Sequence, residues 1–202
     1  MDWKYLFFIL LGYFSGSVLY ARMLPRFLKG VDVTRQSGDG NPGTANAVRL
    51  AGWPVGLLSL GLELAKGAAP VFFAARNLDM SQTAFALVLA APALGHAFPF
   101  GRFTKGGKAI AVSFGCLLGL LPLWQPLALL AGLYIFFSVV LVVSPHLFRS
   151  VLVFGLLAAG CFLLKLPAPV TLGCCLLSAL VILRHLLRYQ GEKPAVRLFK
   201  KA

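Results

Sequence analysis

Long, continuous apolar runs are the feature that most constrains the fold of this chain. They lie at approximately residues 4–21, 53–75, 82–99, 109–122, 124–144, 150–165 and 169–187. Apolar and polar residues do not alternate within them, as they would in the strands of a membrane β-barrel. Because a chain in lipid satisfies its backbone only as helices or as a closed barrel, the pattern predicts an all-α, polytopic integral membrane protein with about seven transmembrane helices.

Composition agrees with a membrane protein of one domain. Hydrophobic residues make up 59% of the chain and charged residues only 12%, which a soluble domain of this length could not hide behind a polar surface. We expect a single membrane-embedded domain over residues 1–202, without a long linker. Several runs are shorter than the ~20 residues of a straight span, and Pro122 and Pro126 interrupt the fourth. Six spans is therefore the alternative count.

The basic residues predict the orientation. The chain has 19 Lys and Arg against 6 Asp and Glu. With the N-terminus outside, fifteen of the basic residues fall in the inner segments 22–52, 100–108, 145–149 and 184–202. The outer segments then contain only Lys4, Arg76 and Lys165. The positive-inside rule thus predicts an outer N-terminus and a cytoplasmic C-terminus. Topology explains most of the charge, and no nucleic-acid partner is expected.

The cysteines do not indicate a cofactor. Cys116, Cys161, Cys174 and Cys175 all lie in apolar runs, without Cys-x-x-Cys spacing or a histidine at metal-ligand spacing. We interpret them as small core residues. Neither a metal nor an organic cofactor is expected, because no His, Cys or carboxylate cluster has suitable spacing.

Residues 36–49 form the first segment with a potential for chemistry. Three glycines, two asparagines and a proline predict a non-helical loop, whose backbone amides can converge on an anion. Thr44, Asn46 and Arg49 can add side-chain donors to phosphate oxygens. A flexible cytoplasmic loop is the alternative interpretation.

Residues 94–108 form the second such segment. Lys105, Gly106, Gly107 and Lys108 place two ammonium groups beside a backbone that a ligand can approach closely. The spacing is not that of a P-loop, but the segment precedes an apolar run whose helical N-terminus could face the same anion. Positive-inside charge at a turn is the alternative interpretation.

Four ionisable residues lie within or at the ends of apolar runs. Glu63 and Lys66 are three residues apart and can neutralise each other on one helix, although charges at membrane depth are also functional candidates. His96 and His185 are predicted at the cytoplasmic ends of the third and seventh runs. Each can be a structural residue or a catalytic one.

Five short elements follow one another over nearly the whole chain. They are Gly16-Ser17, residues 38–46 followed by Arg49, residues 63–67, residues 94–108, and Arg184-His185. Together they resemble the PlsY family, bacterial acyl-phosphate:glycerol-3-phosphate acyltransferases of the inner membrane. In that family a Gly-Ser element, a Gly-Ser-Gly-Asn-x-Gly-Ala-Thr-Asn loop, Asp-x-x-Lys-Gly, Leu-Gly-His…Phe-Lys-Gly-Gly-Lys-Gly and a histidine-containing motif occur in this order.

The resemblance implies a multi-pass protein of the bacterial inner membrane that transfers an acyl group from acyl phosphate to glycerol 3-phosphate, forming lysophosphatidate in phospholipid biosynthesis. Its implied partners are these two substrates and membrane lipid, and we expect a monomer. The residues implied to bind substrate are Gly40, Asn41, Gly43, Thr44, Asn46, Arg49, Lys66, Lys105, Gly106, Gly107 and Lys108. The candidate catalytic residues are His96 and His185, from the resemblance, and Asp39, from a separate hypothesis.

The chain departs from the family pattern at several positions. Asp39 replaces the family's serine, Ala109 replaces a glycine, and Leu186, Leu187 and Arg188 replace polar residues after the last histidine. One hypothesis is that Asp39 is a general base for the acceptor hydroxyl. The alternatives are a non-catalytic or altered-specificity homologue that binds a phosphorylated lipid precursor, and a small-anion transporter.

Overall fold

The computed structural model describes residues 2–199, and most of this part of the chain is helical. The α-helices are α1 (Trp3–Ser17), α2 (Tyr20–Lys29), α3 (Val33–Gln36), α4 (Thr44–Ala51), α5 (Trp53–Asn77), α6 (Phe85–Ala97), α7 (Ile110–Leu118), α8 (Gln125–Ile135), α9 (His146–Leu163) and α10 (Ala168–Leu186). A 3₁₀-helix η1 (Phe103–Lys105), a π-helix η2 (Phe136–Val140) and the antiparallel strands β1 (Leu141–Ser144) and β2 (Ala195–Leu198) complete the described elements.

Each of the seven predicted apolar runs contains a helix. Four helical segments are long and apolar enough to cross a membrane: Trp3–Lys29, Trp53–Asn77, His146–Leu163 and Ala168–Leu186. The apolar helices Phe85–Ala97 and Gln125–Val140 are shorter, and α7 has only 9 residues. The helical membrane architecture is therefore confirmed, whereas the number of spans remains a prediction.

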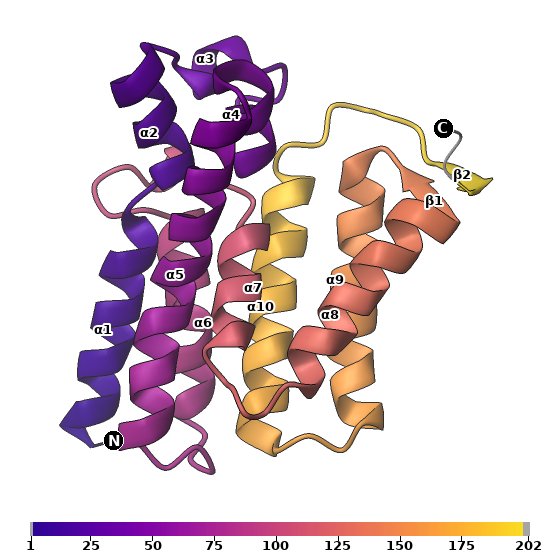
Figure 1. Cartoon of the computed structure of the whole chain (residues 1–202). Helices are drawn as coiled ribbons and strands as arrows, with labels where there is room; N and C mark the ends of the chain where they lie inside the picture. Colours follow the sequence, from indigo (N-terminus) through magenta and orange to yellow (C-terminus); the bar gives the residue numbers. More distant parts are fainter. Residues whose placement is uncertain (1, 200–202) are drawn as a thin grey trace.

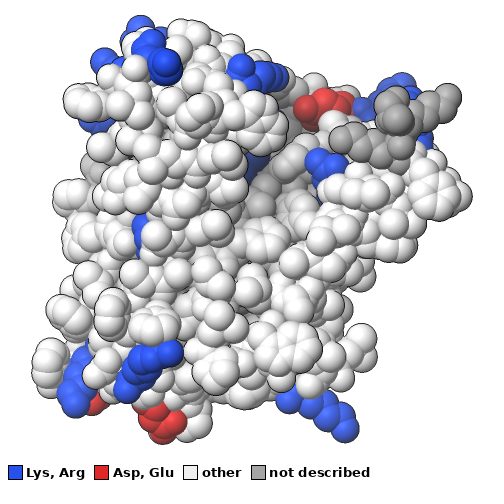
Figure 2. All heavy atoms as spheres, viewed as in Figure 1, with Lys and Arg blue, Asp and Glu red and all other residues white. Residues whose placement is uncertain are grey.

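The main helices run side by side and connect two ends of the molecule (Figure 1). The start of α1 lies at one end, and α10 finishes at the other. The second end also holds α2, α3, α4, the segment between α6 and α7, and the β1–β2 pair. We call it the loop end. In Figure 2 the charged side chains gather at the two ends, and the surface between them is nearly all uncharged, as expected for a chain surrounded by lipid.

Close helix contacts hold the bundle together. Helix α6 packs on α1 and α10, α5 packs on α7, and α9 packs on α10. At the α5–α7 crossing, a Cβ atom added to Gly67 would lie 2.5 Å from the carbonyl oxygen of Val112. The backbones approach this closely only because the residue is glycine. The packing fixes α7, and with it the segment before α7 that contributes to the site.

The prediction of a non-helical segment at residues 36–49 is partly wrong. Residues 37–43 are irregular, but Thr44 begins helix α4. Helix-breaking residues end at Gly43, which is the N-cap residue of α4, and the sequence from Thr44 to Ala51 contains no glycine or proline. The sixth predicted run also starts too late, because α9 begins at His146, immediately after Pro145.

Candidate active site

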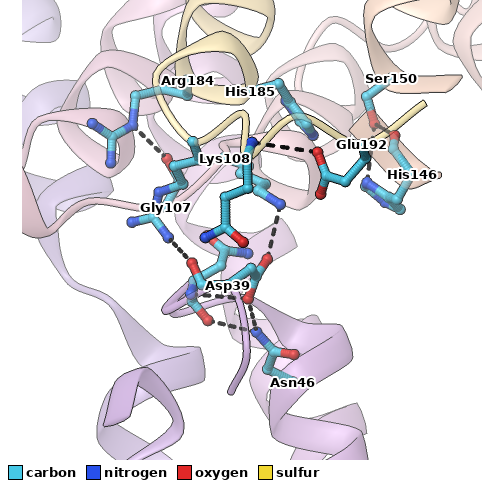
Figure 3. A network of polar contacts seen from close by, with 12 residues as sticks. Asp39, Asn46, Gly107, Lys108, His146, Ser150, Arg184, His185 and Glu192 are labelled. Carbon is cyan, nitrogen blue, oxygen red and sulfur yellow. Dashed lines mark hydrogen bonds and ion pairs between the residues drawn. The ribbon is translucent and has the colours of Figure 1, made fainter. Parts of the chain in front are cut away.

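The two glycine-rich segments meet at the loop end through one ion pair (Figure 3). Lys108 Nζ lies 2.8 Å from Asp39 Oδ2. The other carboxylate oxygen, Oδ1, accepts hydrogen bonds from the backbone N–H of Asn41 at 3.1 Å and from Asn46 Nδ2 at 2.9 Å. Asp39 therefore connects the irregular loop, the first turn of α4 and the segment that leads into α7.

The environment keeps Asp39 ionised. Burial alone would raise the pKa of this carboxyl, but the hydrogen bonds from Lys108, Asn46 and the Asn41 amide outweigh burial and hold the pKa well below its ordinary value. A carboxylate with so low a pKa is a weak base. The geometry thus favours Asp39 as a positioning group over the general base hypothesised from the sequence.

Helix α4 presents its polar side chains beside this pair. Asn46 donates a second hydrogen bond from Nδ2 to the carbonyl oxygen of Asn41 at 2.9 Å. Its side-chain oxygen accepts a hydrogen bond from Arg49 at 3.2 Å. Arg49 is one helical turn further along α4, so its guanidinium reaches Asn46 from the exposed side. Asn46 and Arg49 are three residues apart in α4, so the helical spacing places their side chains next to each other.

Two arginines near the end of α10 hold the backbones of both segments. Arg184 Nε donates to the carbonyl oxygen of Gly107 at 3.1 Å, and its NH2 donates to that of Gly106. Arg188 donates to the carbonyl oxygen of Asp39 at 2.9 Å and to that of Gly106 at 2.8 Å. The two guanidinium groups therefore hold the loops in place through their backbone carbonyl oxygens.

A buried ionic cluster lies below the loops. Glu63 Oε2 is 2.7 Å from Lys66 Nζ and 3.0 Å from His96 Nδ1. Lys66 also donates to the carbonyl oxygen of Val18, and the backbone N–H of Ala21 donates to Glu63 Oε1 at 3.2 Å. The cluster thereby ties α5 and α6 to the junction of α1 and α2, and each charge has a partner.

A pair of histidines, His146 and His185, lies near the same site. The rings of His146, at the start of α9, and His185, near the end of α10, stack with centroids 5.7 Å apart. Ser150 Oγ lies 3.3 Å from His146 Nδ1 and accepts a hydrogen bond from Tyr134 at 2.9 Å. His185 Nδ1 lies 2.8 Å from the carbonyl oxygen of Val181. Hydrogen bonds on Nδ1 orient both rings.

These groups surround a cavity of about 580 Å³. The space-filling view shows the molecule hollowed in its upper half, between the main bundle and the part formed by α8 and α9 (Figure 2). The polar lining residues are Asp39, Asn41, Thr44, Asn46, Glu63, His96, Lys108 and His146. Apolar lining residues include Leu60, Leu64, Ile110 and Phe114. The cavity lining therefore contains both charged and apolar side chains.

The structure brings most of the predicted site residues together. Asp39, Asn41, Gly43, Thr44, Asn46, His96 and Lys108 line the cavity. Gly40 and Arg49 lie in the same loop and helix without lining it, and Lys66 lies behind Glu63 and His96. Gly106 and Gly107 accept hydrogen bonds from Arg184 of α10 and, for Gly106, from Arg188 beyond it. Lys105 is exposed in η1, and His185 is buried and stacks on His146.

Sequence reasoning missed the site roles of four residues. Glu63 was predicted as a partner of Lys66 and as a functional candidate at membrane depth, but not as a residue that lines the cavity together with His96. His146 was overlooked, although a polar break at Ser144-Pro145-His146 between two apolar runs was a usable signal. The roles of Arg184 and Arg188 had no sequence signal, because their partners are backbone carbonyls distant in the chain.

Known proteins similar to this chain identify its family. A sequence profile described as glycerol-3-phosphate acyltransferase matches residues 6–190. The chain belongs to this family. Its members among the similar proteins include a glycerol-3-phosphate acyltransferase of Myxococcus xanthus, 43% identical over 114 residues, which cover 56% of this chain and 59% of that protein.

Two further glycerol-3-phosphate acyltransferases show how far the similarity extends. One from Thermotoga maritima is 43% identical over 112 residues, covering 54% of each chain. The matched stretch thus spans little more than half of the Myxococcus and Thermotoga proteins. With the protein of Shewanella sediminis the identity is 32% over 177 residues, covering 88% of this chain and 84% of that one.

Solved structures of this acyltransferase family have the same fold. The glycerol 3-phosphate form of PlsY (YgiH), an integral membrane glycerol 3-phosphate acyltransferase, matches with a TM-score of 0.77 and 27% identity, covering 91% of this chain and 88% of that one. The lysophosphatidic acid form matches with a TM-score of 0.73 and 28% identity, covering 90% and 87%. The predicted membership of the PlsY family is confirmed.

Proposed function

We propose that this chain transfers an acyl group from acyl phosphate to the 1-hydroxyl of glycerol 3-phosphate, releasing lysophosphatidate and phosphate. The names of its relatives support the acceptor. The PlsY structures, described as glycerol 3-phosphate and lysophosphatidic acid forms, support both the acceptor and the product.

The observation that carries the proposal is the mixed lining of the cavity. Lys108, Asn46 and Thr44 offer a cation and hydrogen-bond donors, while Leu64 and Phe114 offer apolar surface. Phosphate requires the first kind of surface and an acyl chain requires the second. A small-anion transporter has no need for the apolar surface, so the cavity favours the acyltransferase.

The reaction needs no covalent enzyme intermediate, because acyl phosphate is already activated. The acceptor hydroxyl oxygen bonds to the acyl carbon, the bond from that carbon to the phosphate oxygen breaks, and the hydroxyl proton ends on the released phosphate. The protein contributes by holding the reactants together and by neutralising charge. We assign Lys108 to phosphate binding and Arg49 to orientation of Asn46 at the acceptor.

The proposed orientation places the site at the cytoplasmic face of a bacterial inner membrane. The loop end contains the described parts of the four predicted inner segments, in which thirteen of the 19 basic residues occur, as counted from the sequence. Helix α10 ends there, opposite the start of α1. Seven crossings with the N-terminus outside satisfy both observations under the positive-inside rule.

The test uses the purified chain in detergent with acyl phosphate and glycerol 3-phosphate, measuring both phosphate release and lysophosphatidate. We expect Lys108→Gln to reduce turnover about 100-fold, because a cation at the reacting phosphate is removed. Lys105→Gln is the matched control: Lys105 is exposed and does not line the cavity, so its loss should have a much smaller effect.

Two outcomes would count against the proposal. Folded wild-type protein that forms no lysophosphatidate would favour the non-catalytic homologue instead. Equal losses in the two lysine variants would show that cavity position does not distinguish them, and would remove the assigned role of Lys108.

A further inference from the structure

The Asp39 carboxylate occupies the ammonium group that a ligand phosphate would need. We propose that Asp39 is a specificity-determining residue: it competes with phosphate for Lys108 and so lowers the affinity of the site for free phosphate. The proposal rests on the function proposed above, because it takes phosphate groups as the ligands of this cavity.

The ion pair lies where a ligand would enter. Lys108 Nζ and Asp39 Oδ2 are 2.8 Å apart, and both residues line the cavity. The Lys108 side chain is 15% exposed and the Asp39 side chain 38% exposed. When the Lys108 side chain moves toward a bound phosphate, water can therefore take its place as the hydrogen-bond donor to the Asp39 carboxylate. The ion pair is accessible enough for Lys108 to change partners, and Asp39 is close enough to compete with a phosphate for its ammonium group.

The carboxylate stays in place when Lys108 leaves it. Asp39 Oδ1 keeps the hydrogen bonds from the Asn41 amide and Asn46 Nδ2. The Asp39 backbone carbonyl is held by Arg188 at 2.9 Å. A phosphate bound to Lys108 would consequently remain near a fixed negative charge. Asp39 then opposes phosphate in two ways, by occupying its cation and by repelling its charge.

The other nearby cations cannot relieve this competition. Among the described residues, Lys108 is the cavity's only lysine or arginine. Lys66 is paired with Glu63, while Arg184 and Arg188 donate to backbone carbonyls of the loops. A phosphate that pairs with a cation of the cavity must therefore take Lys108 from Asp39.

The competition selects for ligands that have a second anchor. Free phosphate has only its charge to exchange against the carboxylate. A phosphate that carries an acyl chain also buries apolar surface near Leu64 and Phe114. Asp39 thus favours acyl-bearing phosphates over the free phosphate that the reaction releases, and helps that product to leave.

The experiment measures binding of inorganic phosphate to the purified, full-length protein in detergent by isothermal titration calorimetry. We expect Asp39→Asn and Asp39→Ser to bind phosphate about fivefold more tightly than wild type, the scale of a partly exposed ion pair. Asp39→Glu keeps the charge and should show no such gain. Asp32→Asn is the matched control, since Asp32 belongs to the same end of the chain and does not contact Lys108.

The outcomes are decisive in either direction. Unchanged or weaker phosphate binding in folded Asp39→Asn or Asp39→Ser overturns the proposal, as does an equal gain in Asp32→Asn. Retention of the gain after adding Lys108→Gln also overturns it, because the phosphate would then not be on Lys108. Should the neutral variants fail to fold, Lys108→Gln decides: if carboxylate and phosphate share this ammonium group, its removal must abolish phosphate binding, and unchanged binding overturns the proposal. None of these readouts needs acyl transfer, so failure of the proposed enzyme activity is seen separately.

Discussion

At the scale of single residues, the cluster of Glu63, Lys66 and His96 shows how charges can be placed inside an apolar bundle. All three side chains are buried, and Glu63 Oε2 contacts both of the others within 3.0 Å. Mutual pairing offsets the cost of removing them from water. The cluster also places His96 and Glu63 on the cavity wall, so stability and site geometry depend on the same contacts.

We expect Glu63→Gln to destabilise the protein by about 3 kcal/mol, because it leaves the Lys66 charge buried without a counter-charge. The measurement is the unfolding free energy in detergent. Glu192→Gln is the control, since Glu192 is exposed. The double variant Glu63→Gln/Lys66→Gln should recover part of the loss. A single variant as stable as the control would contradict the role of the ion pair.

At the scale of elements, the position of α7 depends on its crossing with α5. Helix α7 follows Lys108 and Ala109 directly, so a shift of this helix moves Lys108 relative to Asp39. Glycines permit the close approach from both sides: Gly67 faces Val112 and Cys116, and Gly115 faces the backbone of Leu64. The two glycine-rich loops are thus held together by packing that lies outside the loops.

Two glycines of α5 allow this packing to be tested with a matched pair. A Cβ atom on Gly67 would lie 2.5 Å from the Val112 oxygen, whereas one on Gly61 would meet nothing within 4 Å. Gly61→Ala should raise stability by about 1 kcal/mol, the difference in helix propensity. Gly67→Ala should lower it by about 1–3 kcal/mol, because overpacking exceeds that gain. Equal thermal shifts in the two variants would show that the crossing tolerates a methyl group.

At the scale of the whole molecule, the loop end unites the cavity, the basic segments and the end of α10. In the proposed reaction, acyl phosphate is water-soluble at one end and lipid-like at the other, whereas glycerol 3-phosphate is wholly water-soluble, so a site at the membrane boundary can receive both. The orientation of the bundle decides which compartment supplies this proposed acceptor.

Cysteine labelling tests this orientation. Ser81, between α5 and α6, and Gln190, after α10, are both exposed and belong to opposite ends of the molecule. In spheroplasts, a membrane-impermeant maleimide should label Ser81→Cys directly and Gln190→Cys only after permeabilisation. The unmodified chain is the control, because its cysteines are buried or half-buried. The reversed pattern would place the site outside.

Much of the fold could be predicted because it depends on local properties. Apolar run length predicts helices in lipid whatever their neighbours are, and all seven runs contain a helix. The start of α4 was missed, since Gly40, Pro42 and Gly43 obscured a helix that begins at Thr44. Resemblance to family motifs located the two loops and Lys108 without the aid of coordinates.

The sequence by itself therefore determined the membrane class, the helical architecture and the family. Only the tertiary structure decided that Lys108 binds Asp39, 69 residues away, and that Arg188 holds the Asp39 backbone from 149 residues away. It also decided that His146 joins the cavity. An apolar run forms a helix because of the surrounding lipid, so it can be recognised from a short stretch of sequence. An ion pair between distant residues forms only if their helices pack together and place the two side chains at the same depth in the membrane.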